Sequence, residues 1–529
     1  MSHSYDWHFP LPRTHTGMLL GNGVFGAMIW GEGGVLRVTL GRADLWDHRG
    51  GIRWHAAMSY ANIRAALEAG DERRLWELFS APANAEGEPK YPSILPIGRF
   101  ELDFGPDAVL TKGTLHLDDG VAEVKLTVHG RSHTVRLAMD MDAPVLGIAC
   151  PKELAMPVPR GVPAWEYVGE YLASIAFSAP HVINEDDCRG WVQARPADPP
   201  LCVAAQARGR ELYLAAVIGE EAAPAARAEI AAAAADGFHG LRTRARAWWN
   251  AYWTTVPAVE IPNARLQFLY DYGMYKFAGL TNPAGVPATL QGPWIEEYQM
   301  PPWSSDYHFN INVQMCYWPA YHGNRLENLK PLFAMIESWT ETLRHNARVF
   351  LGLEDGRMLP HAVDDRCTCI GGFWGGSLDH GCTAWVAQMM YRYYRYTMDD
   401  AFLRHTAYPF MVGAMRVYAG MLERDGEAYS LPVSVSPEYL TKDTRSAWGR
   451  NASFQLACVH RLLEDLGDAA AVLGLAPDPQ WAEIQRRLPT ACLIAGDGGE
   501  QLAIWEGVEL EESHRHHSHL AGITPFDVL

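Results

Sequence analysis

The pattern of apolar and polar positions divides the chain into two parts. In residues 1 to about 220, apolar and polar residues alternate with a period of two, as they do in strands that bury one face. The clearest examples are Val35–Leu40, Ala122–Val128 and His133–Met139. Clusters of Gly, Pro and Asp separate these segments, which is typical of an antiparallel β-sandwich. One helix is expected to interrupt the strands, over Tyr60–Phe79.

From about residue 221 the apolar period becomes 3.6. Glu221–Asp236 is rich in Ala and predicts a helix that leads to a Pro-containing joint at Val256–Pro262. Beyond Asn263 the pattern predicts a series of amphipathic helices, namely Leu266–Leu280, Ala334–Leu351, Thr383–Met398, Ala401–Leu422 and Asn451–Leu466. We therefore expect a multidomain β and α protein. It would consist of a β-sandwich domain over 1–220, a helical linker over 221–262 and an all-helical domain over 263–529.

Charge and composition narrow the classes of partner. The 529 residues include 44 Lys+Arg and 62 Asp+Glu, a formal net charge of −18, with 48% hydrophobic and 20% charged residues. This balance is typical of a folded protein, and the negative charge argues against nucleic acid or an anionic membrane as partner. No apolar run approaches the length of a membrane span, and Met1–His8 shows no secretory signal. We therefore expect a cytoplasmic location.

The cysteine and aromatic content adds two expectations. Nine widely spaced cysteines indicate free thiols rather than a disulfide framework. The 19 Trp and 22 Tyr residues include candidates for stacking against sugar rings, although packing in a large core accounts for most of them. The candidate stacking platforms are Trp303, Trp374 and Trp385.

The first cluster with candidate chemistry is His308, Asn310 and Asn312. On an extended segment these alternating residues would share one face, and the two carboxamides could position an attacking water. The alternative is that the asparagines cap the following helix, since Asn is a common N-cap.

The second cluster is the loop Ser434–Glu438. A carboxylate directly after Pro437 occupies a defined position, and in a Trp-lined cleft burial would raise its pKa, as a general acid requires. The alternative is that Glu438 is an ordinary surface residue.

The third cluster is a polar segment near the end of the sequence, with histidines at 514, 516, 517 and 519. A metal site is not favoured, because the H-E-x-x-H spacing of zinc helices is absent and Arg515 lies among the imidazoles. A donor-rich wall that binds sugar hydroxyls is the preferred interpretation, and a solvated loop is the alternative.

Gly21–Gly26 matches G-x-G-x-x-G without a following βαβ unit, so a dinucleotide site is not expected.

The order of several segments along the chain resembles glycoside hydrolase family 95. These segments are Gly21–Gly31, Asp44–Trp46, Leu290–Trp294, Pro301–Trp303, Asp306–Asn312, Met315–Pro319, Ala384–Trp385, Ala407–Met411, Ser436–Glu438 and His514–Leu520. The resemblance implies a β-sandwich, a helical linker and an (α/α)6-barrel catalytic domain. It also implies an inverting exo-glycosidase that releases α-L-fucose or a related hexose such as L-galactose from an oligosaccharide or glycoconjugate.

The resemblance also implies roles for individual residues. Glu438 matches the family's general acid, and Asn310 and Asn312 match the asparagines that position water. His308, Arg515 and His516 match sugar-contacting residues, and Trp303 and Trp374 are the stacking candidates. No metal and no organic cofactor are called for.

The sequence departs from the family in two places. The family's general-base aspartate is expected beyond Leu529, so the barrel would be incomplete at its C-terminus and the sequence a fragment. The loop His361–Ile370 shows little likeness to the family, so the identity of the sugar stays open. Two alternatives therefore remain, a carbohydrate-binding protein without catalysis and a disaccharide phosphorylase of the same architecture.

Overall fold

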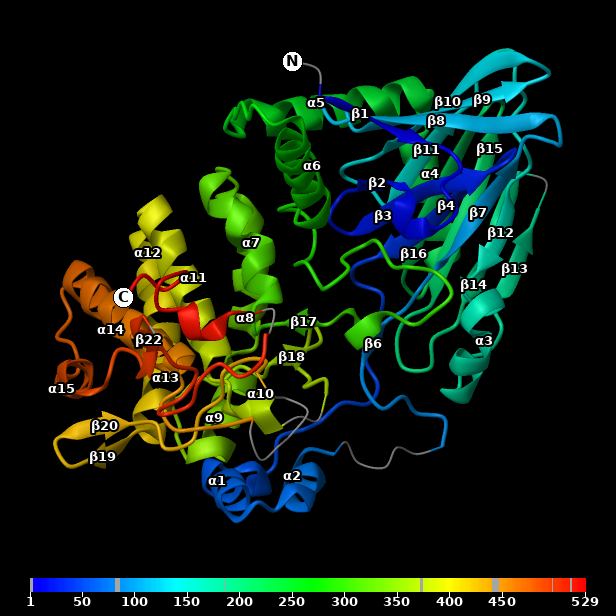
Figure 1. Cartoon of the computed structure of the whole chain (residues 1–529). Coiled ribbons are helices and arrows are strands. Elements are labelled where there is room, and N and C mark those ends of the chain that lie inside the picture. The colour runs from blue at the N-terminus through cyan, green and yellow to red at the C-terminus, as the bar shows by residue number, and fades with distance from the viewer. Residues whose placement is uncertain are drawn as a thin grey trace. The chain divides into compact units, whose positions relative to one another are not determined.

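The computed structural model describes residues 3–80, 86–185, 187–371, 374–439, 447–496, 498–513 and 516–529. The chain forms two compact units. The first consists of Met1–Gly50, Asn84–Asp306 and Pro319–Leu332, and the second of Gly51–Ala83, Tyr307–Trp318 and Phe333–Leu529. Most strands belong to the first unit, and the second is mainly helical (Figure 1).

The first unit contains two antiparallel sheets. The nine-stranded sheet has the order β1-β8-β9-β10-β11-β16-β15-β14-β13, and the five-stranded sheet has the order β12-β7-β4-β3-β2. The strands are β1 Ser4–His8, β2 Met18–Gly21, β3 Phe25–Glu32, β4 Val35–Arg42, β5 Trp46–Asp47, β6 Ser93–Ile94, β7 Gly98–Asp103, β8 Ala108–His116, β9 Val121–Val128, β10 Arg131–Met139, β11 Val145–Ala149, β12 Arg160–Pro163, β13 His181–Asn184, β14 Cys188–Gln193, β15 Leu201–Arg208 and β16 Glu211–Ile218. The three strands predicted from alternation are thus confirmed as β4, β9 and β10.

The core of this unit explains the alternation. Leu36 and Val38 of the smaller sheet belong to the same buried apolar cluster as Val124, Leu126 and Leu137 of the larger one. Burying these side chains removes apolar surface from water, which is the main favourable term in folding. Each period-two segment therefore places its apolar face in a core that both sheets share.

Four helices complete the first unit, namely α3 Trp165–Ser174, α4 Ala222–Ala233, α5 Gly237–Thr255 and α6 Ala264–Leu280. The Ala-rich helix predicted after residue 221 is confirmed as α4, whose Ala226 and Ile230 are buried against residues of β15 and β16. The helix predicted over Leu266–Leu280 is confirmed as α6.

The single helix predicted over Tyr60–Phe79 is wrong in one respect. The structure has two helices there, α1 Tyr60–Ala69 and α2 Glu72–Phe79. Gly70 adopts the left-handed conformation (φ 65°) that ends many helices, and the side chain of Asp71 accepts from the backbone N–H of Arg74 and caps the second. Both helices lie in the second unit.

The remaining elements lie largely in the second unit. Its helices are α7 Asn312–His322, α8 Lys330–Ser338, α9 Thr340–Leu351, α10 Trp374–Leu378, α11 Gly381–Thr397, α12 Asp400–Phe402, α13 Tyr408–Met421, α14 Ser453–Leu473 and α15 Pro479–Arg487. Its short strands are β17 Tyr307–His308, β18 Ala362–Val363, β19 Glu423–Asp425, β20 Ala428–Ser430, β21 Leu493–Gly496 and β22 Gly499–Leu502. The helices predicted over Thr383–Met398 and Asn451–Leu466 are confirmed as α11 and α14.

Two long helices predicted from periodicity are interrupted. The segment 334–351 is divided at Trp339, a buried residue whose indole N–H donates to the carbonyl of Asp365. The segment 401–422 contains a π-helical turn, Leu403–Ala407, directly before Tyr408–Met421. Pro409 lacks the N–H of a regular turn, which accounts for the local widening.

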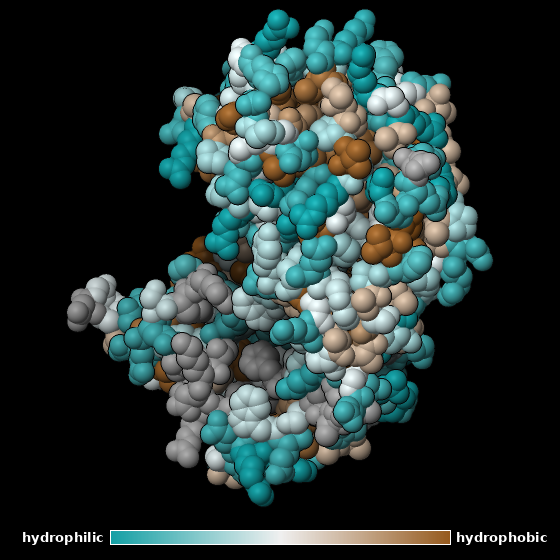
Figure 2. All heavy atoms as spheres, turned by 90° about the vertical axis from the view of Figure 1, so that its right-hand side faces the viewer, coloured by the Kyte–Doolittle hydropathy of each residue, from teal (hydrophilic) through white to brown (hydrophobic). Residues whose placement is uncertain are grey.

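The predicted fold class is therefore confirmed at the level of N-terminal antiparallel sheets and a helical domain. Among the described residues, no helix is both long and apolar enough to cross a membrane. The face shown in Figure 2 is mostly hydrophilic, with apolar residues in small separate patches, as expected for a chain of net charge −18.

Candidate active site

Two short strands bring two histidines together. β17 pairs antiparallel with β18, so that His308 lies opposite Ala362, and the N–H of Phe309 donates to the carbonyl of His361 at 2.7 Å. This pairing places Nε2 of His308 2.9 Å from Nε2 of His361. His361 is buried, whereas 16% of the His308 side chain is exposed. Only the imidazole of His308 can therefore be reached from solvent.

The loop that carries Glu438 is fixed by backbone hydrogen bonds. Ser434 pairs with Gly449 in an isolated β-bridge, and the indole N–H of Trp505 donates to the carbonyl of Ser434. The N–H of Tyr439 donates to the carbonyl of Ser436 at 2.8 Å, which closes a turn around Glu438. The carboxylate is thus presented from a rigid loop, as sites that require precise positioning demand.

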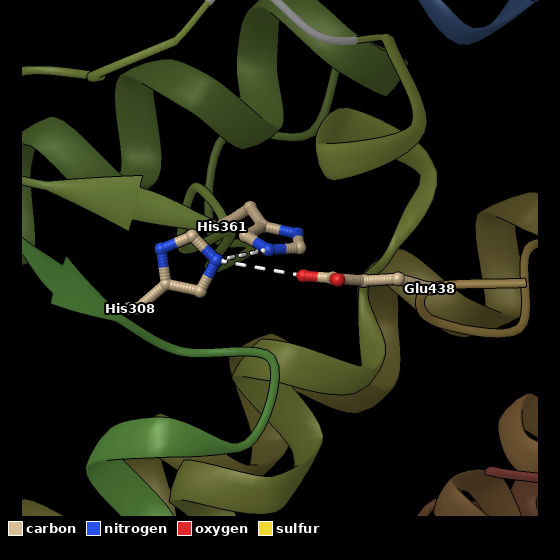
Figure 3. Close-up of side chains that lie close together, drawn as sticks. All are labelled: His308, His361 and Glu438. Atoms are coloured by element: carbon tan, nitrogen blue, oxygen red, sulfur yellow. Dashed lines mark hydrogen bonds and ion pairs between the residues drawn. The ribbon is translucent and has the colours of Figure 1, made fainter. Parts of the chain in front are cut away.

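Three side chains of the described residues face the Glu438 carboxylate. Asn310 Nδ2 donates to its Oε1 at 2.8 Å, His308 Nε2 lies 3.8 Å from the same oxygen, and His516 Nε2 lies 3.9 Å from Oε2. In Figure 3, dashed lines run from one nitrogen of His308 to His361 and to Glu438. The Glu438 side chain is 26% exposed, so a ligand can approach it from solvent.

The charge state of Glu438 differs from the sequence-based expectation. The imidazole of His308, 3.8 Å from Oε1, holds the pKa of this carboxyl well below its usual range, and His516 and the Asn310 amide act in the same direction. Burial acts in the opposite direction and is outweighed. The prediction that desolvation would raise the pKa of Glu438 is therefore wrong, because imidazoles face the carboxylate. Glu438 can keep a proton only if the N–H groups of these imidazoles donate to other acceptors.

A buried polar chain continues behind His361. Its Nδ1 lies 3.8 Å from Oδ2 of Asp379, and Gln455 Nε2 donates to Oδ1 of the same carboxylate at 3.0 Å. The hydroxyl of Tyr418 in turn donates to Oε1 of Gln455, while the Cys382 thiol donates to Asp379 Oδ2. Burial lowers the pKa of His361 well below its usual value and raises that of Asp379 to about 7. A neutral His361 is the consequence near neutral pH.

Sequence reasoning missed His361 and Asp379 as members of this cluster. His361 begins the loop that showed little likeness to the resembled family, and Asp379 belongs to a segment without a recognised motif. Their proximity depends on the pairing of β17 with β18, and two-residue strands leave no periodicity in a sequence.

The two asparagines lie in different environments. β17 ends at His308, the chain turns over 309–311, and Asn312 begins α7. Asn310 is 1% exposed, and within the described part of the chain its Oδ1 has no hydrogen-bond partner, whereas Asn312 is exposed. The expected common face on one extended segment is therefore wrong, because the backbone turns between the two residues.

The polar segment near residue 516 approaches the Glu438 loop. Ser518 Oγ lies 2.6 Å from Ser436 Oγ, and the short helix Ser518–Leu520 begins two residues after His516. The site candidate Arg515 and its neighbour His514 lie outside the described residues. This contact explains how His516 reaches the carboxylate of Glu438.

The three tryptophan candidates lie in different elements of the structure. Trp303 belongs to a short 3-10 turn, Pro302–Ser305, of the first unit, and its side chain is 68% exposed. Trp374 begins α10, but its side chain lies outside the described residues. The third stacking candidate, Trp385, is buried in α11 and packs edge-on against Phe526, so its indole belongs to the core.

The ligand types in this cluster raise the question of a metal. Donor atoms of His308, His361 and Glu438 all lie within 4.8 Å of one another. Two imidazole nitrogens that share a tetrahedral zinc ion lie about 3.3 Å apart, since each bond is 2.0–2.1 Å. At 2.9 Å the two nitrogens are at direct hydrogen-bond distance, which fits a shared proton better than a shared ion.

Comparisons with known proteins place this geometry in context. The model of the glycosyl hydrolase family 95 catalytic domain matches residues 255–529. "Alpha-L-fucosidase 2" of Arabidopsis thaliana is 29% identical over 278 residues, which cover 49% of this chain and 32% of that protein. "Probable alpha-fucosidase A" of Aspergillus niger is 32% identical over 166 residues, 30% of this chain and 20% of that protein. The chain thus spans about a third or less of the length of these relatives.

A solved structure shares the fold over most of the chain. A protein from the human microbiome, assigned as a kojibiose phosphorylase, superimposes with a TM-score of 0.59 at 10% identity. The superposition covers 92% of this chain and 71% of that one. At this identity the likeness concerns the fold alone.

Proposed function

The chain belongs to glycosyl hydrolase family 95, and on that premise we propose that the protein is an exo-acting, inverting glycosidase. It would release α-L-fucose, or a related hexose such as L-galactose, from an oligosaccharide or glycoconjugate. The observation that carries the proposal is the Glu438 carboxylate, a quarter exposed and faced by Asn310, His308 and His516. The α-fucosidases among its relatives support the choice of sugar.

In this proposal Glu438 is the general acid. It would protonate the glycosidic oxygen as the bond to the sugar breaks, while a water attacks the opposite face. Asn310 donates to Glu438 through Nδ2, and its buried Oδ1 is available to accept from that water. Asn312 would assist Asn310 in positioning the attacking water. A carboxylate base about 6.5–9.5 Å from the acid would complete an inverting site, and the family resemblance assigns that role to an aspartate.

The remaining site residues would bind the sugar. His308, Arg515 and His516 supply donors for hydroxyl groups, and Trp303 and Trp374 supply apolar ring faces. We further propose that the helical part forms an (α/α)6 barrel. We also keep the division into a sandwich over 1–220, a linker over 221–262 and a catalytic domain over 263–529. The fold likeness to the phosphorylase supports the barrel.

A stereochemical assay tests this proposal. The protein that contains this sequence is incubated with an α-L-fucoside, and the first anomer released is followed by proton NMR. Release of β-L-fucose before mutarotation is the expected result. First release of the α-anomer would contradict inversion, and absence of any product together with measurable fucose binding would favour a carbohydrate-binding protein.

The sequence leaves open a second candidate, a disaccharide phosphorylase of the same architecture, which the same assay can test. A phosphorylase uses inorganic phosphate where an inverting hydrolase uses base-activated water. The same assay with and without phosphate separates the two, because a hydrolase forms free sugar at a rate that does not depend on phosphate. Formation of a sugar 1-phosphate would identify a phosphorylase.

A further inference from the structure

The carboxylates of Glu438 and Asp379 are connected through two imidazoles. His308 Nε2 lies 3.8 Å from Glu438 and 2.9 Å from His361 Nε2, and His361 Nδ1 lies 3.8 Å from Asp379 (Figure 3). Only the Glu438 end of this chain is exposed to ligands, since Asp379 and His361 are 1% and 6% exposed. His361 and Asp379 therefore cannot touch a sugar, and any effect they have on catalysis acts through His308.

Only one hydrogen can lie between the two Nε2 atoms. A neutral imidazole has one N–H and one lone pair, so one ring must donate to the other. If His361 carries its proton on Nδ1, its Nε2 accepts, and the Nε2–H of His308 points to His361. If His361 carries its proton on Nε2, it donates to His308 instead. The tautomer of His361 thus decides the role of His308.

Asp379 favours the first arrangement. Its Oδ2 faces Nδ1 of His361, and above the raised pKa of Asp379, about 7, the charged carboxylate attracts the proton to that nitrogen. Gln455 and Cys382 donate to the carboxylate and hold it in place. Among the described residues, the titratable groups near His361 are His308, Asp379, Cys382, Glu438 and His516, and of these Asp379 faces the Nδ1 side.

We propose that His361, whose Nδ1 faces Asp379, is a positioning residue: its Nε2 accepts the hydrogen bond from Nε2–H of His308 and thereby lets Glu438 keep its own proton. Distance supports this choice, because the hydrogen bond to His361 at 2.9 Å competes with a contact to Glu438 at 3.8 Å. Without His361, the N–H of His308 would turn to the carboxylate of Glu438 and stabilise its charged form. This inference rests on the proposed role of Glu438 as general acid.

The first test is the pH profile of kcat/KM for α-L-fucoside hydrolysis. A general acid works in its protonated form, so activity falls as the pH rises through its pKa. His361→Phe removes the acceptor, and we expect the basic limb of the profile to move at least one pH unit lower. His361→Gln, whose amide oxygen can accept, should restore most of this shift. A basic limb that stays in place in a folded His361→Phe protein would overturn the inference.

The matched control is His460→Phe. His460 is as buried as His361, its Nε2 lies 3.2 Å from the carbonyl of Leu488, and it lies outside the chain from Glu438 to Asp379. We expect it to cost stability without moving the basic limb. A shift of the limb in this variant equal to that of His361→Phe would mean that lost packing causes both, and the inference would fail.

The second test needs no turnover. Imidazole ¹⁵N chemical shifts of the His-labelled protein report which ring nitrogen carries the proton, and His308→Phe and His361→Phe assign the signals. We expect the proton of His361 on Nδ1 and that of His308 on Nε2. The reverse arrangement in an active enzyme overturns the inference and leaves the proposed function intact. The expected tautomers in a protein that hydrolyses no fucoside would refute the proposed function and support the proton arrangement.

Discussion

Asn310 donates a hydrogen bond of 2.8 Å to Oε1 of Glu438, across 128 residues of sequence. Because this oxygen already accepts, the proton of a neutral Glu438 carboxyl belongs on Oε2, the atom that faces His516 at 3.9 Å. The leaving oxygen of a bound sugar should therefore approach from the side of Oε2. If Glu438 is the general acid, Asn310 would select which of its two carboxyl oxygens reacts.

The first prediction concerns the acid itself. Glu438→Gln retains the shape and the hydrogen bond to Asn310 but has no proton to transfer. We expect kcat to fall by about 10²–10⁴, the usual contribution of a general acid, with sugar binding preserved. Rates of hydrolysis and calorimetric binding of L-fucose measure the two effects separately. Turnover within a few-fold of wild type would remove Glu438 from this role.

The second prediction separates the two asparagines. Asn310→Ala removes a donor to Glu438 and the buried Oδ1, so we expect kcat to fall about 100-fold and the basic limb of the pH profile to move higher. The upward shift follows because the lost hydrogen bond stabilised the charged carboxylate. Asn312→Ala provides the comparison, since Asn312 is exposed at the start of α7. If kcat falls less than fivefold in Asn312→Ala, the water-positioning role is restricted to Asn310.

The third prediction concerns the exposed tryptophan. If Trp303 stacks on the sugar ring, Trp303→Ala should raise KM roughly three- to tenfold with little change in kcat, as expected for a lost aromatic contact of about 0.5–1.5 kcal/mol. Trp76→Ala is a suitable control, because Trp76 is a comparably exposed indole on α2, with 56% exposed against 68%. Equal KM values for both variants would argue against stacking at Trp303.

The fourth prediction concerns metals. Since the Nε2 atoms of His308 and His361 lie at direct hydrogen-bond distance, the site should work without a bound ion. Prolonged dialysis against EDTA should leave kcat/KM unchanged, as measured on the same fucoside. A loss of activity that Zn²⁺ or Ca²⁺ restores would show that the shared proton is the wrong description.

The fifth prediction concerns stability at low pH. Burial lowers the pKa of His380 to about 4, while the unfolded chain takes up the proton near 6.5. Between these values the unfolded state binds more protons, so this residue makes the free energy of unfolding fall as the pH falls. Asp379 and Asp465, with pKa values raised to about 7, act in the opposite direction.

Urea unfolding at pH 7 and pH 4.5 isolates the contribution of His380. His380→Gln keeps a donor for the carbonyl of Ala414 but cannot be protonated. We therefore expect its free energy of unfolding to fall less than that of wild type between the two pH values, by up to ~3 kcal/mol. An identical pH dependence in both proteins would contradict the prediction.

Much of the fold follows from the sequence because the period of the apolar residues is local information. Val35–Arg42 alternates and forms β4, and the period of 3.6 in Ser453–Leu473 forms α14. The interruptions at Gly70 and Trp339 were not predicted. The period of the apolar residues does not show either interruption. At Gly70 the helix ends because the backbone turns left-handed, and at Trp339 a buried indole donates to the carbonyl of Asp365.

The candidate site could be predicted only in part. Glu438, His308 and Asn310 were singled out from residue type and spacing, the family resemblance suggested their roles, and the structure brings them together. The direction of the Glu438 pKa was wrong, because a sequence cannot show which imidazoles face a carboxylate. The positions of His361 and Asp379 in this cluster were not predicted for the same reason, since they depend on neighbours that are distant in sequence.

The pairing of β17 with β18 has a consequence for how the protein is made. His308 and His361 are 53 residues apart, and Asn310 and Glu438 are 128 apart, so every contact of the site closes a long loop. Such contacts form late, because their loop-closure entropy is compensated only once the surrounding helices have packed. On the ribosome, a nascent chain would already contain folded sheets while its histidines were still far from Glu438. The candidate site would then assemble only after the sheets have folded.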